Sequence, residues 1–140
     1  MRALVVDASV AVKWFVSEAD SDAAERLLGS TGTFHAPELL KSELTNALWK
    51  NITKGMISEE QATSALAGIE RSITKWHPVD PLLPQALAWA VEHAHPIYDF
   101  CYLALARSLG VTMVTADKRL LRTLGGTPAA EYATSLSEIR

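Results

Sequence analysis

The chain has 140 residues, of which 49% are hydrophobic, and this is enough apolar material for one domain with a sizeable core. Its net charge is −3, so the chain lacks the overall positive charge that is typical of nucleic-acid-binding proteins. This disfavours a passive nucleic-acid binder, although local basic patches could still contact a nucleic acid. The single cysteine, Cys101, excludes a disulfide within the chain and fits a reducing, cytoplasmic location. No segment is apolar for long enough to predict a membrane helix, and Asp7 and Lys13 interrupt the N-terminal apolar run in a way that disfavours a signal peptide.

The first half of the chain begins with a buried-type strand. Residues 3–6 are four apolar residues in a row and predict a strand that is covered on both faces. A second strand is expected at 33–36, and helices at 10–15, 23–28, 37–54 and 58–73. Pro37 suits a first helical turn, and Ser58 with Gln61 forms a capping box.

The second half repeats the alternation of strands and helices. Strands are expected at 75–79, 111–115 and, at a sheet edge, 132–134, and helices at 81–92, 97–109 and 117–124. Strands that alternate with helices imply a parallel sheet with right-handed crossovers. We therefore expect an α/β fold in which residues 1–140 form a single domain, because the chain contains no repeat, linker or low-complexity run.

Two acidic residues directly follow the strongest strand signals. Asp7 comes after 3–6, and Asp117 comes after 111–116 with the hydroxyl of Thr115 beside it. Ligands of open parallel sheets bind at the carboxyl ends of strands, so both residues are candidates for a site. Each could instead cap the helix that follows, and Ser9 competes with Asp7 for that role.

Two further acids interrupt apolar helices. Glu43 falls within the stripe formed by Leu40, Leu44, Ala47 and Leu48, where it could serve function or reach solvent from the edge of the stripe. Asp99 is the only charge in the first turns of a helix that is apolar all round from 100 to 106. The helix dipole favours an acid at that position, so a structural role is an alternative there too.

Taken together, the four acids occur where a parallel sheet would bring them to one end. Clustered carboxylates repel one another and resist desolvation, so at least one should have a raised pKa. The usual resolution is a hard divalent cation held by oxygen ligands, Mg²⁺ or, as a substitute, Mn²⁺. The histidines lack zinc-site spacing, and His35 and His77 are predicted to be isolated residues at the surface or the core edge. No glycine-rich phosphate loop or nucleophile elbow is present.

Four segments of the chain resemble, in order, the motifs of PIN-domain nucleases: VVDAS (5–9), SELTNAL (42–48), YDFCYLALA (98–106) and VTADKRL (114–120). In length and motif order the chain is similar to VapC-type toxins of toxin–antitoxin pairs. The resemblance implies a parallel sheet of order 3-2-1-4-5 and Mg²⁺-dependent RNA cleavage. It places the acidic site on Asp7, Glu43, Asp99 and Asp117, with Ser9, Asn46 and Thr115 in supporting positions.

The resulting hypothesis is a metal-dependent endoribonuclease. Asp7 and Asp99 are expected as the main metal ligands, with Glu43 and Asp117 completing the shell directly or through water. The alternatives are a metal-dependent phosphohydrolase of small phosphoesters and a non-catalytic RNA-binding PIN-like module. RNA contacts would come from local basic residues: Lys13, Lys41, Lys50, Lys54, Lys118, Arg119 and Arg122.

The resemblance also implies partners. VapC-type toxins are typically homodimers that bind an antitoxin in an apolar groove. Trp14 and Phe15 are neighbours on a short helix and could form an exposed apolar face for such a partner, or could equally belong to the core.

Overall fold

The computed structural model describes residues 2–30 and 32–139, and its centre is a parallel five-stranded sheet of order β3-β2-β1-β4-β5. The strands are β1 (Ala3–Val6), β2 (Thr33–Pro37), β3 (Lys75–His77), β4 (Thr112–Thr115) and β5 (Ala133–Ser135). The predicted fold class and strand order are confirmed. Because every pair is parallel, the carboxyl ends of all strands meet at one edge of the sheet.

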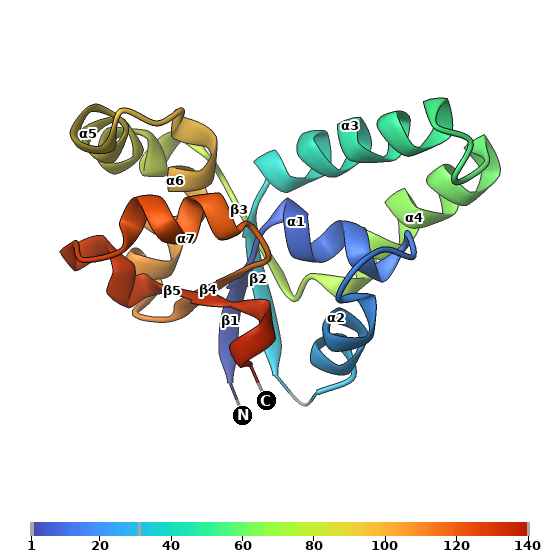
Figure 1. Cartoon of the computed structure of the whole chain (residues 1–140), viewed down its shortest axis with the longest axis horizontal. Coiled ribbons are helices and arrows are strands. Elements are labelled where there is room, and N and C mark those ends of the chain that lie inside the picture. The colour runs from blue at the N-terminus through green and yellow to red at the C-terminus, as the bar shows by residue number, and fades with distance from the viewer. Residues whose placement is uncertain (1, 31, 140) are drawn as a thin grey trace.

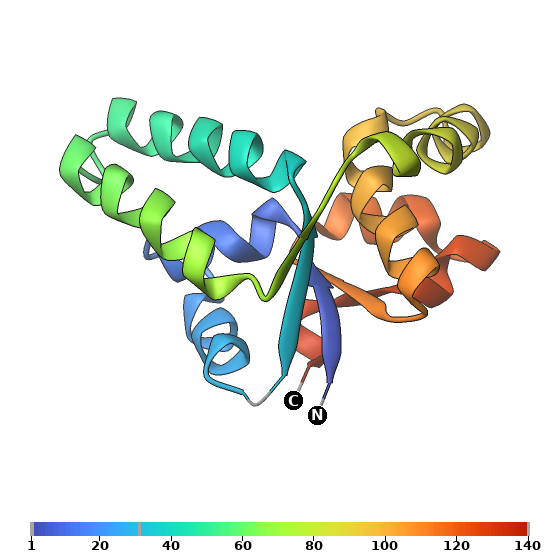
Figure 2. The ribbon, with the colours of Figure 1, turned by 180° about the vertical axis from the view of Figure 1, so that it is seen from behind.

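Helices lie to both sides of the central strands. Helices α1 to α4 gather on one side of β1 and β2, and α5 to α7 gather on the other (Figures 1 and 2). The bounds are α1 (Ala8–Ala11), α2 (Ser21–Leu28), α3 (Leu39–Thr53), α4 (Glu59–Ser72), α5 (Leu83–His93), α6 (Ile97–Leu109) and α7 (Lys118–Leu124), and 3₁₀ turns cover Val12–Trp14, Asp80–Leu82, Pro128–Tyr132 and Leu136–Glu138. None of the helices described here combines the length and the hydropathy needed to cross a membrane.

Several element boundaries differ from the sequence-based expectation. Pro37 does not begin α3 but ends β2, where it lies opposite His77, and the amide of Glu38 donates to the His77 carbonyl. This pairing fixes the backbone of Pro37 as strand, so the helix starts at Leu39. The strand expected at 75–79 ends at His77, because a 3₁₀ turn begins at Asp80 and leads into α5.

The helix ends follow local capping chemistry. Ser58 Oγ accepts from the amide of Gln61 at 3.1 Å, and Gln61 Oε1 accepts from the amide of Ser58 at 2.8 Å, which confirms the capping box of α4. Helix α6 ends at Gly110, whose φ of +69° is in the left-handed region that glycine adopts at little cost.

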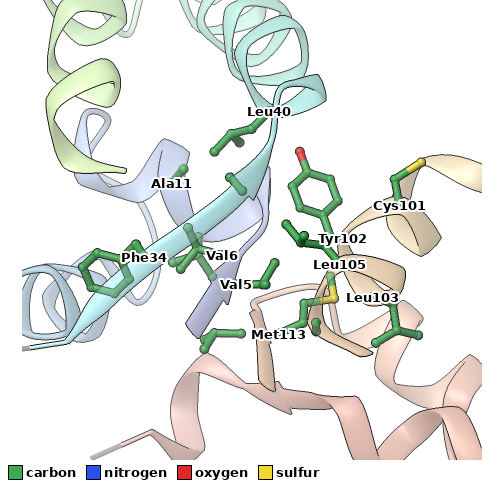
Figure 3. Packing of buried hydrophobic residues seen from close by; sticks show 14 of the residues in the cluster. Val5, Val6, Ala11, Phe34, Leu40, Cys101, Tyr102, Leu103, Leu105 and Met113 are labelled. Carbon is green, nitrogen blue, oxygen red and sulfur yellow. The ribbon is translucent and has the colours of Figure 1, made fainter. Parts of the chain in front are cut away.

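The core forms around β1, β4 and α6. Residues 100–106 of α6 are all buried, including Cys101, and Figure 3 shows α6 side chains facing Val5 and Met113 of the sheet. Burial on every side explains why α6 lacks an amphipathic stripe.

Trp14 and Phe15 do not form an exposed face. The Trp14 ring lies 5.6 Å from the ring of Phe34, and its Nε1 donates to the Ala24 carbonyl at 2.8 Å. Phe15 packs against α4, where a Cβ placed on Gly68 would come within 2.7 Å of the ring. Both aromatics are partly buried and pack against the core, which favours the core alternative over an exposed apolar face.

Candidate active site

Asp7 directly follows β1 at the centre of the sheet and is buried, with 3% of its surface exposed. Its Oδ1 accepts from Ser9 Oγ at 2.6 Å and from the amide of Val10 at 3.1 Å. Its Oδ2 accepts from Thr115 Oγ1 at 2.5 Å, a contact that crosses from β1 to the end of β4. Asp7 therefore caps α1 and also anchors a hydroxyl cluster, so the cap and site interpretations are not exclusive.

The pKa of the Asp7 carboxyl group is higher than that of an aspartate in water. Burial raises its pKa from 3.8 to about 6, and the negative charge of Asp99 acts in the same direction. The hydrogen bonds from Ser9, Thr115 and Val10 lower the pKa but do not offset the loss of solvation. The prediction that at least one acid has a raised pKa is confirmed for Asp7, with burial rather than repulsion among the acids as the main cause.

Glu43 lies on α3, which begins just after the end of β2, the strand next to β1. Its Oε1 accepts from the hydroxyl of Tyr102 at 2.6 Å. Burial raises the pKa of Glu43, the charge of Asp99 adds to the rise, and the bond from Tyr102 opposes it. Glu43 therefore does not simply extend into solvent from the stripe of α3.

Tyr102 connects the acids, although the sequence did not single it out. It is buried on α6, and Figure 3 shows its hydroxyl directed toward the start of α3 near Leu40. Burial raises its pKa well above the usual value, and the charges of Glu43, Asp7 and Asp99 contribute to that rise. One signal was available: Tyr102 follows Asp99 by three residues, which places both side chains on one face of the helix.

Asp99 lies in the first turn of α6, as predicted, and its Oδ2 is 2.8 Å from Nε2 of His95. His95 precedes the helix and packs edge-on against Phe100, with ring centroids 5.2 Å apart. No pattern in the sequence indicated this contact between His95 and Asp99. It depends on the turn at Pro96, which local periodicity does not describe.

Asp117 occupies a different position from the other three acids. Its Oδ1 accepts from the amides of Arg119 at 2.9 Å and Leu120 at 3.1 Å, and it thereby caps α7. Its charge is not among the causes of the raised pKa of Asp7 or Glu43. Its amide nevertheless donates to Thr115 Oγ1 at 3.0 Å, which ties it to the hydroxyl cluster around Asp7.

Of the three predicted supporting residues, Ser9 and Thr115 lie next to Asp7, and Asn46 lies next to Glu43. Ser9 and Thr115 bind Asp7 directly, and the amide of Ala116 donates to Ser9 Oγ at 2.9 Å. Asn46 lies instead on the exposed surface of α3, beside Glu43 in a hollow of about 450 Å³. The hollow is lined also by Ala8, Ser42, Lys50 and Tyr98.

The chemistry of the donor set fits a hard divalent cation, because Asp7, Glu43 and Asp99 present only carboxylate oxygens and Asp99 raises the pKa of the other two. Within the part of the chain that the structure describes, no three acidic, imidazole or thiol groups already stand at metal-binding separation. The oxygens are occupied by Ser9, Thr115, Tyr102 and His95, so binding an ion would require exchange of some of these hydrogen bonds.

The other histidines also differ from expectation. His35 and His77 are not isolated, because Nδ1 of His35 lies 2.9 Å from Nε2 of His77 across β2 and β3. Both rings are partly buried, which lowers their pKa values. Adjacent strands brought them together, and the sequence separation gave no sign of this.

Comparison with known proteins agrees with this architecture. The family model "PIN domain" matches residues 4–125. Ribonuclease VapC3 of Pyrobaculum aerophilum is 34% identical over 119 residues, covering 84% of this chain and 91% of the relative. Ribonuclease VapC1 of Mycobacterium tuberculosis is 35% identical over 120 residues, covering 86% and 90%.

A solved structure shares the fold at lower identity. A chain of the toxin–antitoxin complex from Klebsiella pneumoniae is 14% identical with a TM-score of 0.66, covering 97% of this chain and 99% of the other. With two relatives at or above 34% identity and a family model that spans most of the sequence, the chain belongs to the PIN-domain family, as a VapC-type member.

Proposed function

We propose that this protein is a Mg²⁺-dependent endoribonuclease, with Mn²⁺ as a substitute, and the toxin of a toxin–antitoxin pair. The observation that carries the proposal is that Asp7 and Glu43, from separate elements, are both partly or fully buried near the carboxyl edge of the sheet and both experience the negative charge of Asp99 from a third element. Relatives that share about a third of their residues with this chain are named ribonucleases.

The proposed roles follow from the setting of each side chain. Asp7 and Asp99 are the main ligands, and Glu43 completes the shell directly or through water. When bound, the ion would activate water for in-line attack on a phosphodiester and stabilise charge on the phosphoryl oxygens. Asp7 is the rigid member of the set, because three hydrogen bonds fix its carboxylate against the sheet.

Other residues hold the acids in place. Ser9 and Thr115 orient Asp7, and Tyr102 orients Glu43. We assign Asp117 an outer role, since it already caps α7 and reaches the cluster through its backbone bond to Thr115. Replacing Asp117 should therefore reduce activity less than replacing Asp7 or Asp99.

The test is cleavage of RNA by purified variants. Asp7→Asn and Asp99→Asn should abolish cleavage while circular dichroism shows an intact fold, and Asp80→Asn, an exposed carboxylate in the turn before α5, should cleave as the unaltered protein does. EDTA should stop the reaction, and Mg²⁺ or Mn²⁺ should restore it. Full activity in excess EDTA would refute the metal-dependent mechanism, and hydrolysis of small phosphoesters without RNA cleavage would favour a phosphohydrolase.

We also propose that an antitoxin protein inhibits the enzyme and that the toxin is a homodimer. A structure with the same fold was solved as a toxin–antitoxin complex. An apolar groove of about 420 Å³ between α3 and α4, lined by Leu48, Ile52 and Leu66 among others, offers a surface for a partner segment. A monomer by light scattering at micromolar concentration, with no partner from its own operon bound, would contradict both proposals.

The proposed PIN domain comprises residues 1–140, which is more than the matched region. Strand β5 (Ala133–Ser135) lies after residue 125 yet pairs with β4 and completes the sheet. Leu136, just beyond it, is buried in the core.

A further inference from the structure

We propose that α3 carries a track for single-stranded RNA that leads to the candidate active site, with Tyr98 and Trp49 as platforms on which bases stack. The track consists of Tyr98, Ser42, Asn46, Trp49 and Lys50. This inference rests on the proposed ribonuclease function and adds to it the form of the substrate and the residues that hold it.

The first observation is that two hollows join across α3. The hollow of about 450 Å³ beside Glu43 contains Tyr98 and Lys50, and a second one of about 480 Å³ contains Trp49. Ser42 and Asn46 line both hollows, so the surface is continuous from Glu43 to the outer side of the helix. A chain in this track would pass directly over Glu43.

The second observation concerns the two aromatic side chains. Tyr98 is 54% exposed and Trp49 is 58% exposed, whereas other aromatics such as Phe100 and Tyr102 are buried. Neither ring stacks on another aromatic or on a cation within the described residues. Exposed, unpartnered rings beside a hollow suit unstacked bases, because every base presents a flat face.

The charges favour a nucleic acid in this position. Lys50 is exposed and forms no ion pair with the described residues, so its ammonium group is available to a phosphate. Lys41, by contrast, binds Glu70 at 2.9 Å and lies 4.6 Å from the centre of the Trp76 ring. The amide of Asn46 and the hydroxyl of Ser42 add polar groups that a base edge or a ribose can use.

The track suits a nucleic acid because Ser42 and Asn46 line both of its hollows and Lys50 borders the hollow beside Glu43. The groove on the other side of Trp49 has Leu48, Ile52 and Leu66 in its wall. The two platforms also require bases that are not already stacked in a duplex, which favours a single strand.

The experiment measures binding of a short, unstructured, fluorescently labelled RNA to the full chain in EDTA, which prevents cleavage. Tyr98→Ala and Trp49→Ala should each weaken binding by about 5- to 150-fold, whereas Tyr98→Phe should bind as the unaltered protein does. Leu87→Ala is the matched control, because Leu87 is 60% exposed and lies on α5. Duplex RNA of the same sequence should bind more weakly.

The salt dependence of binding tests the assignment of Lys50. Lys50→Ala should lower the slope of the logarithm of affinity against the logarithm of salt concentration by about 1. Lys75→Ala, at the exposed start of β3, should leave the slope unchanged.

The results separate the track from the proposed function. If the unaltered protein neither binds nor cleaves any RNA, the ribonuclease proposal fails and the track fails with it. If it cleaves RNA while Tyr98→Ala and Trp49→Ala bind RNA with unaltered affinity, only the track is overturned. Loss of partner-protein binding in Tyr98→Ala, whose site lies outside the groove between α3 and α4, would then identify the surface as a protein contact.

Discussion

Replacing Asp7 with asparagine should stabilise the metal-free protein at neutral pH, although the same change should abolish catalysis. Asparagine has nearly the shape of aspartate, and its Oδ1 can keep the bonds from Ser9 Oγ and the Val10 amide. Its Nδ2 can donate to Thr115 Oγ1, whose own proton can turn toward Ser9 Oγ, 3.3 Å away. The substitution therefore removes a buried charge and leaves the hydrogen-bond network largely satisfied.

The size and the pH dependence of the effect follow from the raised pKa of Asp7. Because the pKa rises from 3.8 to about 6, the folded state binds more protons than the unfolded state within this pH window. The stability of the unaltered protein thus falls as the pH rises through that window and stays low above it. A shift of about 2 pH units corresponds to about 3 kcal/mol, because each unit is worth about 1.4 kcal/mol.

The assay is urea unfolding in EDTA, followed by tryptophan fluorescence between about pH 4 and pH 8. The free energies of unfolding of the two proteins should nearly coincide at the acid end, and Asp7→Asn should be the more stable by about 3 kcal/mol at the neutral end. Asp80→Asn should follow the unaltered protein throughout. Parallel curves for Asp7→Asn and the unaltered protein would show that the Asp7 carboxylate is not destabilised by burial, and the reasoning would be refuted.

Further changes test other parts of the structure. Tyr102→Phe removes the donor to Glu43, so it should cost about 1–3 kcal/mol of stability in urea unfolding. Tyr132→Phe should leave the stability unchanged. Gly68→Ala places a Cβ within 2.7 Å of Phe15, so it should lower the free energy of unfolding by about 1–3 kcal/mol, measured as a lower melting temperature. The control, Gly55→Ala, meets no neighbouring atom and reports only the backbone strain at φ +74°. Mg²⁺ at a hundredfold excess over its dissociation constant should stabilise the unaltered protein by about 2.7 kcal/mol in the same unfolding assay and should stabilise Asp7→Asn less. Equal stabilisation of both proteins would exclude Asp7 as a ligand.

The sequence alone determined the alternation of strands and helices. Apolar runs identified β1 and β4, the capping box identified the start of α4, and the helix predicted at 97–109 coincides with α6. These features depend on periodicity and on backbone capping, which act over a few residues and are therefore visible locally. The resemblance to PIN-domain nucleases supplied the strand order, which the sheet confirms.

Only the tertiary structure decided how the acids differ. Asp7 and Asp117 both follow a buried strand, yet Asp7 is buried and accepts from two hydroxyls whereas Asp117 turns to cap α7. Glu43, within a helix, accepts from Tyr102. Burial and the sharing of hydrogen bonds depend on residues that are distant in sequence: Thr115 follows Asp7 by 108 positions, and Tyr102 follows Glu43 by 59. For the same reason, the contact of His95 with Asp99 and the packing of Trp14 against the core depend on contacts between elements, which no local pattern of the sequence records.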